Sequence, residues 1–223
     1  MDSSFWHRKW SEGQIGFHQT VFNKRLTAFW SDVLAGADPG KVFVPLCGKS
    51  SDMLWLHQRG HDVVGIELSE KAVSAFFTEN NLSAESDNVD GITSYTGTEQ
   101  ARGIRLMVAD YFALRPQHLQ ECMTFYDRAS LIALPEAMRP DYARQLAALM
   151  PAGSRGLLLS IAYNEAQMKG PPFSVSDEKV RDLLGQWFTI EQLARFNGPQ
   201  HVGNLAKRGL ESLDERVYLL VRR

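Results

Sequence analysis

Short uninterrupted runs of apolar residues recur along the chain and alternate with segments whose apolar residues are spaced three and four apart. Runs of the first kind predict strands that are buried on both faces, as in a parallel sheet. Segments of the second kind predict helices with one apolar face. The predicted strands are residues 42–44, 63–66, 104–109, 123–126, 156–162, 187–193 and 216–221. The pattern predicts an α/β fold in which the last two strands form an antiparallel edge.

The N-terminal segment is rich in aromatic residues but follows neither a helical nor a strand period. Phe5, Trp6, Trp10 and Phe17 are interspersed with glycines. We predict an irregular aromatic arm over residues 1–17. It either buries its rings on the domain surface or forms a lid over a ligand, because aromatic rings pack well on purines and on cations.

Three segments between the strands complete the predicted layout. A helix that starts at His18 or Thr20 is expected to run to Leu34, with Val21 and Phe22 already on its buried face. Residues 135–150 predict a second helix. Residues 83–103 are polar and punctuated by glycine, which indicates an insertion or a marginal hairpin.

Residues 41–67 indicate a strand, a tight turn, a helix and a second strand, and they carry the strongest functional signal. Gly48 lies in the turn, where the absence of a side chain lets the backbone approach a ligand closely. Glu67 ends the second strand. The separation of Gly48 and Glu67 along the sequence is close to about 20 residues. In nucleotide-binding folds this is the spacing between the first turn and the carboxylate that contacts the ribose hydroxyls. An ordinary turn glycine and a solvated strand end are the alternatives.

Two later strands end in candidate binding residues. Asp110 and Tyr111 follow the third strand, where a carboxylate and a backbone N–H would suit an adenine ring. The alternative is an aspartate that caps the turn. Arg128 follows the fourth strand, where its two-pronged donors would hold a carboxylate. For this residue the alternative is a surface salt bridge.

Several other chemistries are excluded by missing motifs. A phosphate-binding P-loop needs a glycine where the chain has Phe43, and the GxGxxG fingerprint of dinucleotide sites is absent. There is no GxSxG elbow, and the histidines and the two cysteines lack metal-ligand spacing, so we expect no metal. A cofactor pocket without acid–base residues favours methyl transfer from S-adenosylmethionine. Positioning alone contributes about 7–11 kcal/mol to such a reaction.

Length and composition favour a single domain over residues 1–223. The chain is 44% hydrophobic and has a net charge of −2, so nothing in its charge favours nucleic acid or an acidic membrane surface. The N-terminus lacks the apolar core of a signal peptide, and no apolar run is long enough to span a bilayer. We expect a cytoplasmic monomer with reduced thiols.

Several stretches together resemble thiopurine S-methyltransferases. They are WHRKWSEGQIGFHQ, VFVPLCGKSSDMLWL, RGHDVVGIELSE, FFTENNLS, YDRASLIAL, KGPPFSVS and ERVYLL. The similarity spans essentially the whole chain and implies the class I S-adenosylmethionine-dependent methyltransferase fold. This is a Rossmann-like, seven-stranded mixed sheet with helices on both faces and strand order 3-2-1-4-5-7-6. The implied acceptor is a thiopurine or another small thiol, and bacterial-looking members are linked to selenium and tellurium compounds as well.

The resemblance also implies roles for individual residues. The expected cofactor-binding residues are Trp10, Leu46, Gly48, Glu67, Leu68, Asp110, Tyr111 and Arg128. Phe17 and Arg128 are expected to contact the acceptor. Two positions depart from animal members: Asp110 replaces a serine, and Asn204 stands where those members have a basic residue, although Lys207 and Arg208 lie close by.

Two other function classes share this type of sheet. A nicotinamide-dependent oxidoreductase is disfavoured because the turn has a single glycine. A non-catalytic nucleotide sensor, or an RNA-binding module, is the second alternative. The lack of a basic stripe argues against RNA.

Overall fold

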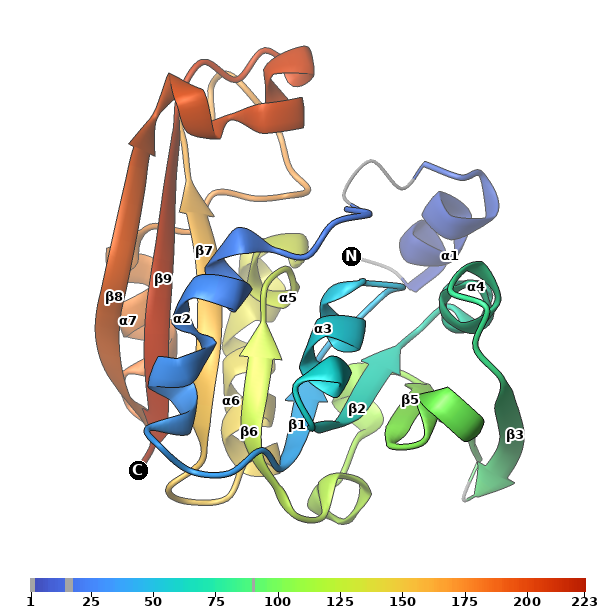
Figure 1. Ribbon diagram of the computed structural model, residues 1–223. Coiled ribbons are helices and arrows are strands. Elements are labelled where there is room, and N and C mark those ends of the chain that lie inside the picture. Colours follow the sequence, from blue (N-terminus) through green and yellow to red (C-terminus); the bar gives the residue numbers. More distant parts are fainter. Residues whose placement is uncertain (1–2, 15–17, 90) are drawn as a thin grey trace. The chain divides into compact units, whose positions relative to one another are not determined.

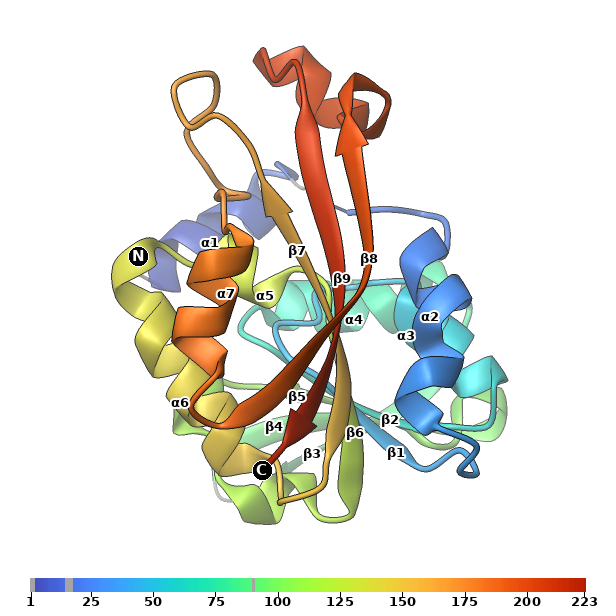
Figure 2. The same ribbon diagram turned by 90° about the vertical axis from the view of Figure 1, so that its left-hand side faces the viewer.

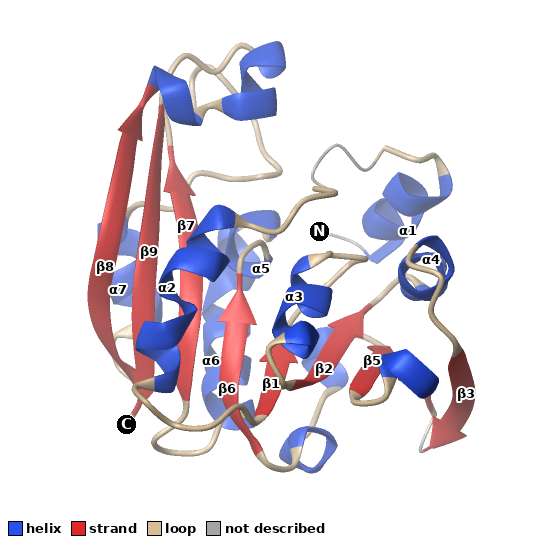
Figure 3. Cartoon of the chain, in the orientation of Figure 1, coloured by secondary structure: helices blue, strands red, loops and turns tan. Residues whose placement is uncertain are grey.

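The computed structural model describes residues 3–14, 18–89 and 91–223, and the chain forms two compact units with the boundary between Tyr126 and Asp127. Helices and strands alternate along most of the chain (Figure 3), as the hydrophobic pattern predicts. No helix within the described ranges combines the length and the apolar character that crossing a membrane requires.

Within its described residues, the first unit holds six strands in the order β3-β4-β5-β2-β1-β6, and Figure 1 labels all of these except β4. Its elements are α1 (Ser3–Ser11), α2 (Lys24–Leu34), β1 (Lys41–Val44), α3 (Asp52–Gln58), β2 (Asp62–Glu67), α4 (Glu70–Glu79), β3 (Ala84–Val89), β4 (Ile92–Gly97), β5 (Ile104–Val108) and β6 (Cys122–Asp127), whose last residue already belongs to the second unit. Strands β5, β2, β1 and β6 are parallel. This part reproduces the predicted order 3-2-1-4.

The second unit is a three-stranded antiparallel sheet in the order β7-β9-β8. Its elements are α5 (Ser130–Ala133), α6 (Arg139–Leu149), β7 (Arg155–Ala162), α7 (Asp177–Leu184), β8 (Phe188–Gly198) and β9 (Leu213–Arg222). Helices α6 and α7 lie on the same side of these strands (Figure 2). The order 5-7-6 predicted for this half is confirmed.

Burial explains why the apolar runs form the central strands. Val42 and Phe43 of β1, Val63 of β2 and Ile104 of β5 are fully buried although neighbouring residues of a strand point to opposite faces. A parallel strand covered on both faces has this property. The continuous apolar runs are therefore a direct consequence of the position of these strands in the sheet.

Residues 83–103 form a hairpin, one of the two predicted alternatives. Strands β3 and β4 pair with each other in antiparallel register, and β4 also pairs with β5. The hairpin adds two strands to the expected seven. Most of β3 is exposed, and its polar sequence AESDNV protects an open sheet edge from pairing with another chain.

The prediction of an irregular N-terminal arm is wrong for residues 3–11, which form helix α1. One face of this helix carries Trp10, which is 5% exposed. Lys71 of α4 donates a hydrogen bond to the carbonyl of Ser11 at 3.2 Å, so α1 is attached to α4. The two glycines made the pattern look irregular, but they come after the helix has ended. Phe17 lies outside the described residues.

The prediction that a helix starts at His18 or Thr20 is also wrong. Helix α2 begins at Lys24 because the side chain of Asn23 caps it, accepting hydrogen bonds from the N–H groups of Arg25 (2.8 Å) and Leu26 (3.4 Å). Val21 precedes the helix and is 68% exposed. Apolar spacing extended the predicted helix past a capping residue that marks its true start.

Candidate active site

The candidate residues of the first unit come together because three parallel strands end at the same edge of its sheet. Val44 at the end of β1 pairs with Gly65 of β2, and Glu67 at the end of β2 pairs with Val108 of β5. The N–H of Ala109 donates to the carbonyl of Glu67 at 3.1 Å. This register places the turn after β1, the Glu67 side chain and the segment after β5 along one edge.

The turn after β1 has an unusual backbone conformation. Leu46 and Gly48 both have positive φ angles, 44° and 53°. A non-glycine residue rarely adopts such an angle, so Leu46 carries strain that its surroundings must offset. The N–H of Cys47 donates to the carbonyl of Ile66 at 2.9 Å. This hydrogen bond joins the turn to β2.

Glu67 is buried, and backbone donors hold both of its carboxyl oxygens. Oε2 accepts from the N–H of Gly48 at 3.0 Å, and Oε1 accepts from the N–H of Ser69 at 2.8 Å. Burial raises the pKa of Glu67, while the backbone donors of Ser69, Gly48 and Leu68 act in the opposite direction. Each carboxylate oxygen has a second lone pair. Hydroxyl donors such as those of a ribose could bind to these second lone pairs.

Trp10 lies against the same turn. A Cβ added to Gly48 would lie 3.3 Å from Cζ2 of Trp10 and 3.7 Å from Cη2. The glycine thus leaves a space that any other residue would fill, next to an indole ring and beside the Glu67 carboxylate. These three features fit an aromatic, hydroxyl-bearing nucleoside, and S-adenosylmethionine is one.

In the segment after β5, Asp110 has the capping role that was one of its two predicted alternatives. Oδ1 of Asp110 accepts from the N–H of Phe112 at 3.0 Å and caps a short 3₁₀ helix, Tyr111–Ala113. The capping alternative is therefore confirmed. The ring of Tyr111 is buried and stacks on Phe43 with centroids 6.5 Å apart. The ring of Tyr111 therefore belongs to the core, and the predicted contact of this segment with an adenine stays a prediction.

Arg128 belongs to the second unit and directly follows a buried carboxylate. Oδ1 of Asp127 accepts from the N–H of Ser130 at 2.9 Å, and Oδ2 accepts from the hydroxyl of Tyr142 at 2.6 Å. Burial raises the pKa of Asp127, and these hydrogen bonds lower it. Together they fix the backbone on both sides of Arg128. The predicted contacts of Arg128 and Phe17 with an acceptor remain predictions.

The two cysteines are buried thiols with raised pKa values. Cys47 lies in the turn and Cys122 begins β6, and both are buried. Burial raises the pKa of Cys47 well above its usual value, aided by the Glu67 charge, and it raises the pKa of Cys122 to about 11. Among the described residues, no group of three or more metal-binding side chains occurs.

A separate cavity of about 320 Å³ opens at the other edge of the same sheet. Lys41, Asp62, Ile104 and Arg105 line it, and these residues are at the starts of β1, β2 and β5. The candidate site lies at the ends of these strands. The cavity therefore does not overlap the turn and Glu67.

Sequence reasoning missed two residues that support the site. The backbone N–H of Ser69 orients Glu67, which no side-chain pattern reveals. Asp52 is buried at the start of α3, where Oδ1 accepts from the N–H of Asn23 at 2.8 Å and Oδ2 from the hydroxyl of Tyr126 at 3.0 Å. An acidic residue in the first turn of a helix was the available signal, but its partners are distant in sequence.

Comparison with known proteins gives independent evidence on the family of this chain. The family model described as Thiopurine S-methyltransferase (TPMT) matches residues 1–223. The chain is 46% identical over 222 residues to a thiopurine S-methyltransferase of Pseudomonas aeruginosa, with 100% of both chains covered. It is also 46% identical over 226 residues to the thiopurine S-methyltransferase of Shewanella piezotolerans, again with 100% of both chains covered.

Solved structures show the same fold at low sequence identity. One is a Burkholderia thailandensis 1,6-didemethyltoxoflavin-N1-methyltransferase with bound S-adenosylhomocysteine (TM-score 0.62, 15% identity, 99% of this chain and 86% of that chain). Another is an S-adenosylmethionine-dependent methyltransferase from Methanosarcina mazei (TM-score 0.64, 12% identity, 91% and 99%). The fold is that of the class I methyltransferases, as predicted, and the chain belongs to the thiopurine S-methyltransferase family.

Proposed function

We propose that this protein transfers the methyl group of S-adenosylmethionine to the sulfur of a small thiol, with thiopurines as the main acceptor class. The observation that carries the proposal is the Glu67 carboxylate, held by two backbone N–H groups beside the side-chain-free position at Gly48. Membership of the family supports the same assignment.

The chain's own residues would hold the cofactor at the carboxyl edge of the first unit. Glu67 would accept hydrogen bonds from the ribose hydroxyls. Leu46 and Gly48 would bring backbone close to the cofactor, and Trp10 would pack its ring against it. Leu68 and the Asp110–Tyr111 segment, next to Glu67 in the strand register, would contact the adenine.

The bound cofactor supplies a methyl group that is already electrophilic because it is attached to a sulfonium. The task left to the protein is to orient the acceptor sulfur and exclude water. The ribose hydroxyls would occupy the remaining lone pairs of Glu67, and Cys47 is buried with a raised pKa, so neither is placed to act as a general base. This arrangement suits acceptors that arrive as soft anions.

The acceptor side rests on Arg128 and Phe17. Arg128 would orient the acceptor through its fixed pair of N–H donors, since Asp127 and its partners hold the adjoining backbone. Phe17 would provide an aromatic wall. Helix α1 would act with residues 12–17 as a lid, because it brings Trp10 onto the cofactor turn.

The same proposal extends to acceptors other than thiols. Soft selenium and tellurium anions would be methylated as well, since they too need alignment more than proton removal.

The proposal also covers the organisation of the protein. We expect one methyltransferase domain over residues 1–223 that acts as a cytoplasmic monomer without nucleic acid. Elution of the purified protein at the monomer volume in size-exclusion chromatography checks the oligomeric state.

The test combines binding with catalysis. Calorimetry should detect S-adenosylhomocysteine, and mass spectrometry should detect methylated product with a thiopurine, an aliphatic thiol and selenite supplied in parallel. Binding without any methylated product would support a nucleotide sensor instead. A fluorescence change with NADH and none with S-adenosylhomocysteine would support the oxidoreductase alternative.

A further inference from the structure

The loop between β7 and α7, residues 163–176, contains backbone carbonyls that cannot be satisfied by regular pairing. Pro171 and Pro172 have no N–H group, and this part of the loop belongs to neither helix nor strand. Unpaired polar backbone costs free energy wherever water is restricted. Because Lys169 is exposed and Pro171 is half-buried, either water or a side chain of the second unit can supply the donors for these carbonyls.

Arg208 supplies two of these donors from a distant segment. It lies at the end of the 3₁₀ helix Gly203–Arg208, and its guanidinium donates from Nη1 to the carbonyl of Pro171 at 2.7 Å and from Nη2 to that of Lys169 at 2.8 Å. One planar fork thus spans two carbonyls of the loop. A lysine ammonium presents its donors from a single atom and cannot reproduce this geometry.

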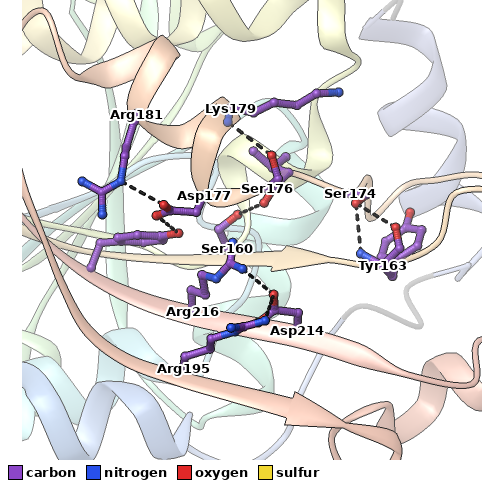
Figure 4. A network of polar contacts seen from close by, with 12 residues as sticks. Ser160, Tyr163, Ser174, Ser176, Asp177, Lys179, Arg181, Arg195, Asp214 and Arg216 are labelled. Carbon is purple, nitrogen blue, oxygen red and sulfur yellow. Dashed lines mark hydrogen bonds and ion pairs between the residues drawn. The ribbon is translucent and has the colours of Figure 1, made fainter.

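The remaining contacts fix the rest of the loop. The hydroxyl of Tyr163 donates to the carbonyl of Pro172 at 2.5 Å. Oγ of Ser174 accepts from the N–H of Tyr163 at 3.0 Å and donates to its carbonyl at 3.1 Å (Figure 4). The N–H of Phe173 donates to the carbonyl of Ile132 at 2.6 Å. Within the described residues, the side-chain hydrogen bonds to carbonyls 169 and 171 come from Arg208.

The loop and the Arg208 segment also share apolar packing. Met168 of the loop, Val202 beside the 3₁₀ helix, and Ile161 of β7 belong to one buried cluster, and Tyr163 and Leu205 pack against it. Both segments therefore lie beyond the end of β7, where ligands of open α/β sheets are bound.

We infer that Arg208 is a positioning residue that sets the acceptor specificity by fixing the loop at residues 169–172. This inference rests on the proposed function, because it gives the loop a role in binding the acceptor. The family resemblance puts Lys207 and Arg208 close to Asn204, where animal members have a basic residue. Arg208 is instead engaged with backbone carbonyls, so it shapes the acceptor side through the loop.

The first test measures kinetics with a thiopurine acceptor. Arg208→Met keeps the aliphatic stem and removes the donors, and it should raise the acceptor KM about tenfold, while the S-adenosylmethionine KM changes less than about twofold. Arg208→Lys should recover only part of this loss. Lys207→Met, which removes the neighbouring exposed charge, should behave as wild type. An equal KM increase in Lys207→Met, or an unchanged KM in Arg208→Met, would overturn the inference.

The second test does not depend on activity. Hydrogen exchange should be faster in peptides that cover residues 164–175 in Arg208→Met, and unchanged in Lys207→Met. If wild type methylates no acceptor, the proposed function fails, and this measurement still decides whether Arg208 fixes the loop. Unaltered hydrogen exchange in Arg208→Met would show that the hydrogen bonds of Arg208 do not hold the loop.

Discussion

The carboxylate of Glu67 and the backbone N–H of Gly48 are joined by a hydrogen bond of 3.0 Å, which connects the end of β2 to the turn after β1. Two residues 19 positions apart in sequence are thus parts of one structural unit. The same carboxylate that would bind the cofactor also stabilises the turn that would receive it. Changes at either residue should therefore affect both folding and binding.

Replacing Glu67 by alanine should weaken S-adenosylhomocysteine binding by about 1–3 kcal/mol, because ribose hydroxyls and two backbone donors lose their acceptor. Isothermal titration calorimetry measures the loss, and circular dichroism shows whether the variant is folded. Glu85→Ala, a change on the exposed strand β3, serves as the control and should bind like wild type. Wild-type affinity in a folded Glu67→Ala variant would remove this residue from the site.

Replacing Gly48 by alanine should strain the turn in two ways. A non-glycine residue at φ 53° costs about 1–2 kcal/mol, and its Cβ would approach the Trp10 ring to 3.3 Å. We expect cofactor affinity to fall about tenfold or more, as seen by calorimetry. In the double variant Gly48→Ala with Trp10→Ala, the two losses should not add, because the steric part has been removed. Strict additivity would mean that the two residues act independently.

Cofactor affinity should fall as the medium becomes more acidic. Burial raises the folded pKa of Glu67 above its ordinary value of 4.5, and a protonated carboxyl is a weaker acceptor for ribose hydroxyls. Titrating S-adenosylhomocysteine from neutral pH down to the ordinary carboxyl pKa of 4.5 should show weaker binding as the pH falls through the raised pKa. The isosteric variant Glu67→Gln should bind more weakly but lack this pH dependence. A wild-type affinity that does not change over this range contradicts the assignment.

His61 should make the first unit less stable in mild acid. Its Nε2 accepts from the indole N–H of Trp30 at 2.8 Å, so the proton is on Nδ1, which lies 2.9 Å from the carbonyl of Gly40. Burial lowers the folded pKa below 6.5. Above pH 6.5, His61 is neutral in the folded and in the unfolded chain. Below that pH, the unfolded chain binds a proton at His61 that the folded chain does not bind. The free energy of unfolding should therefore decrease as the pH drops from 6.5 to the lowered pKa of the folded chain.

Urea denaturation at several pH values checks this contribution. His61→Gln can still donate and accept but does not titrate, so its stability should change less between about pH 7 and pH 5.5 than that of wild type. His57 provides the matched control, since its ring contacts the carbonyl of Gln100 and it is less buried. If His57→Gln changes the pH slope more than His61→Gln, the assignment to His61 is wrong.

Tyr142→Phe should destabilise the second unit by about 1–3 kcal/mol, because Oδ2 of the buried Asp127 carboxylate loses its hydroxyl donor. Tyr95→Phe removes a similar hydroxyl–carboxylate bond to Glu70 at 2.8 Å on the surface, and it should cost less than about 0.5 kcal/mol. The free energy of unfolding in urea compares the two. Equal costs would show that burial does not decide the contribution of these bonds.

The sequence predicted the fold best where burial dictates residue type. Continuous apolar runs identified β1, β2 and β7, since strands covered on both faces accept little else. The spacing from Gly48 to Glu67 predicted their proximity, because a strand–turn–helix–strand unit has a nearly fixed length. These features are encoded locally.

What the sequence did not reveal depends on distant partners. The Asn23 cap overrides apolar spacing at the start of α2, and no local pattern predicts that helix α1 lies against α4. Arg208 contacts carbonyls 37 and 39 positions away. Contacts to backbone leave no requirement on the residue type of the partner, so they have no signature in a single sequence.

The burial of Cys47 and Cys122 has a practical consequence for the laboratory. These are the only cysteines of the chain, and their raised pKa values keep both as unreactive thiols near neutral pH. A colorimetric reagent for sulfhydryl groups would therefore report consumption of an added substrate with little background from the enzyme itself. A cysteine engineered on the exposed hairpin would, by the same reasoning, be labelled by a fluorophore selectively.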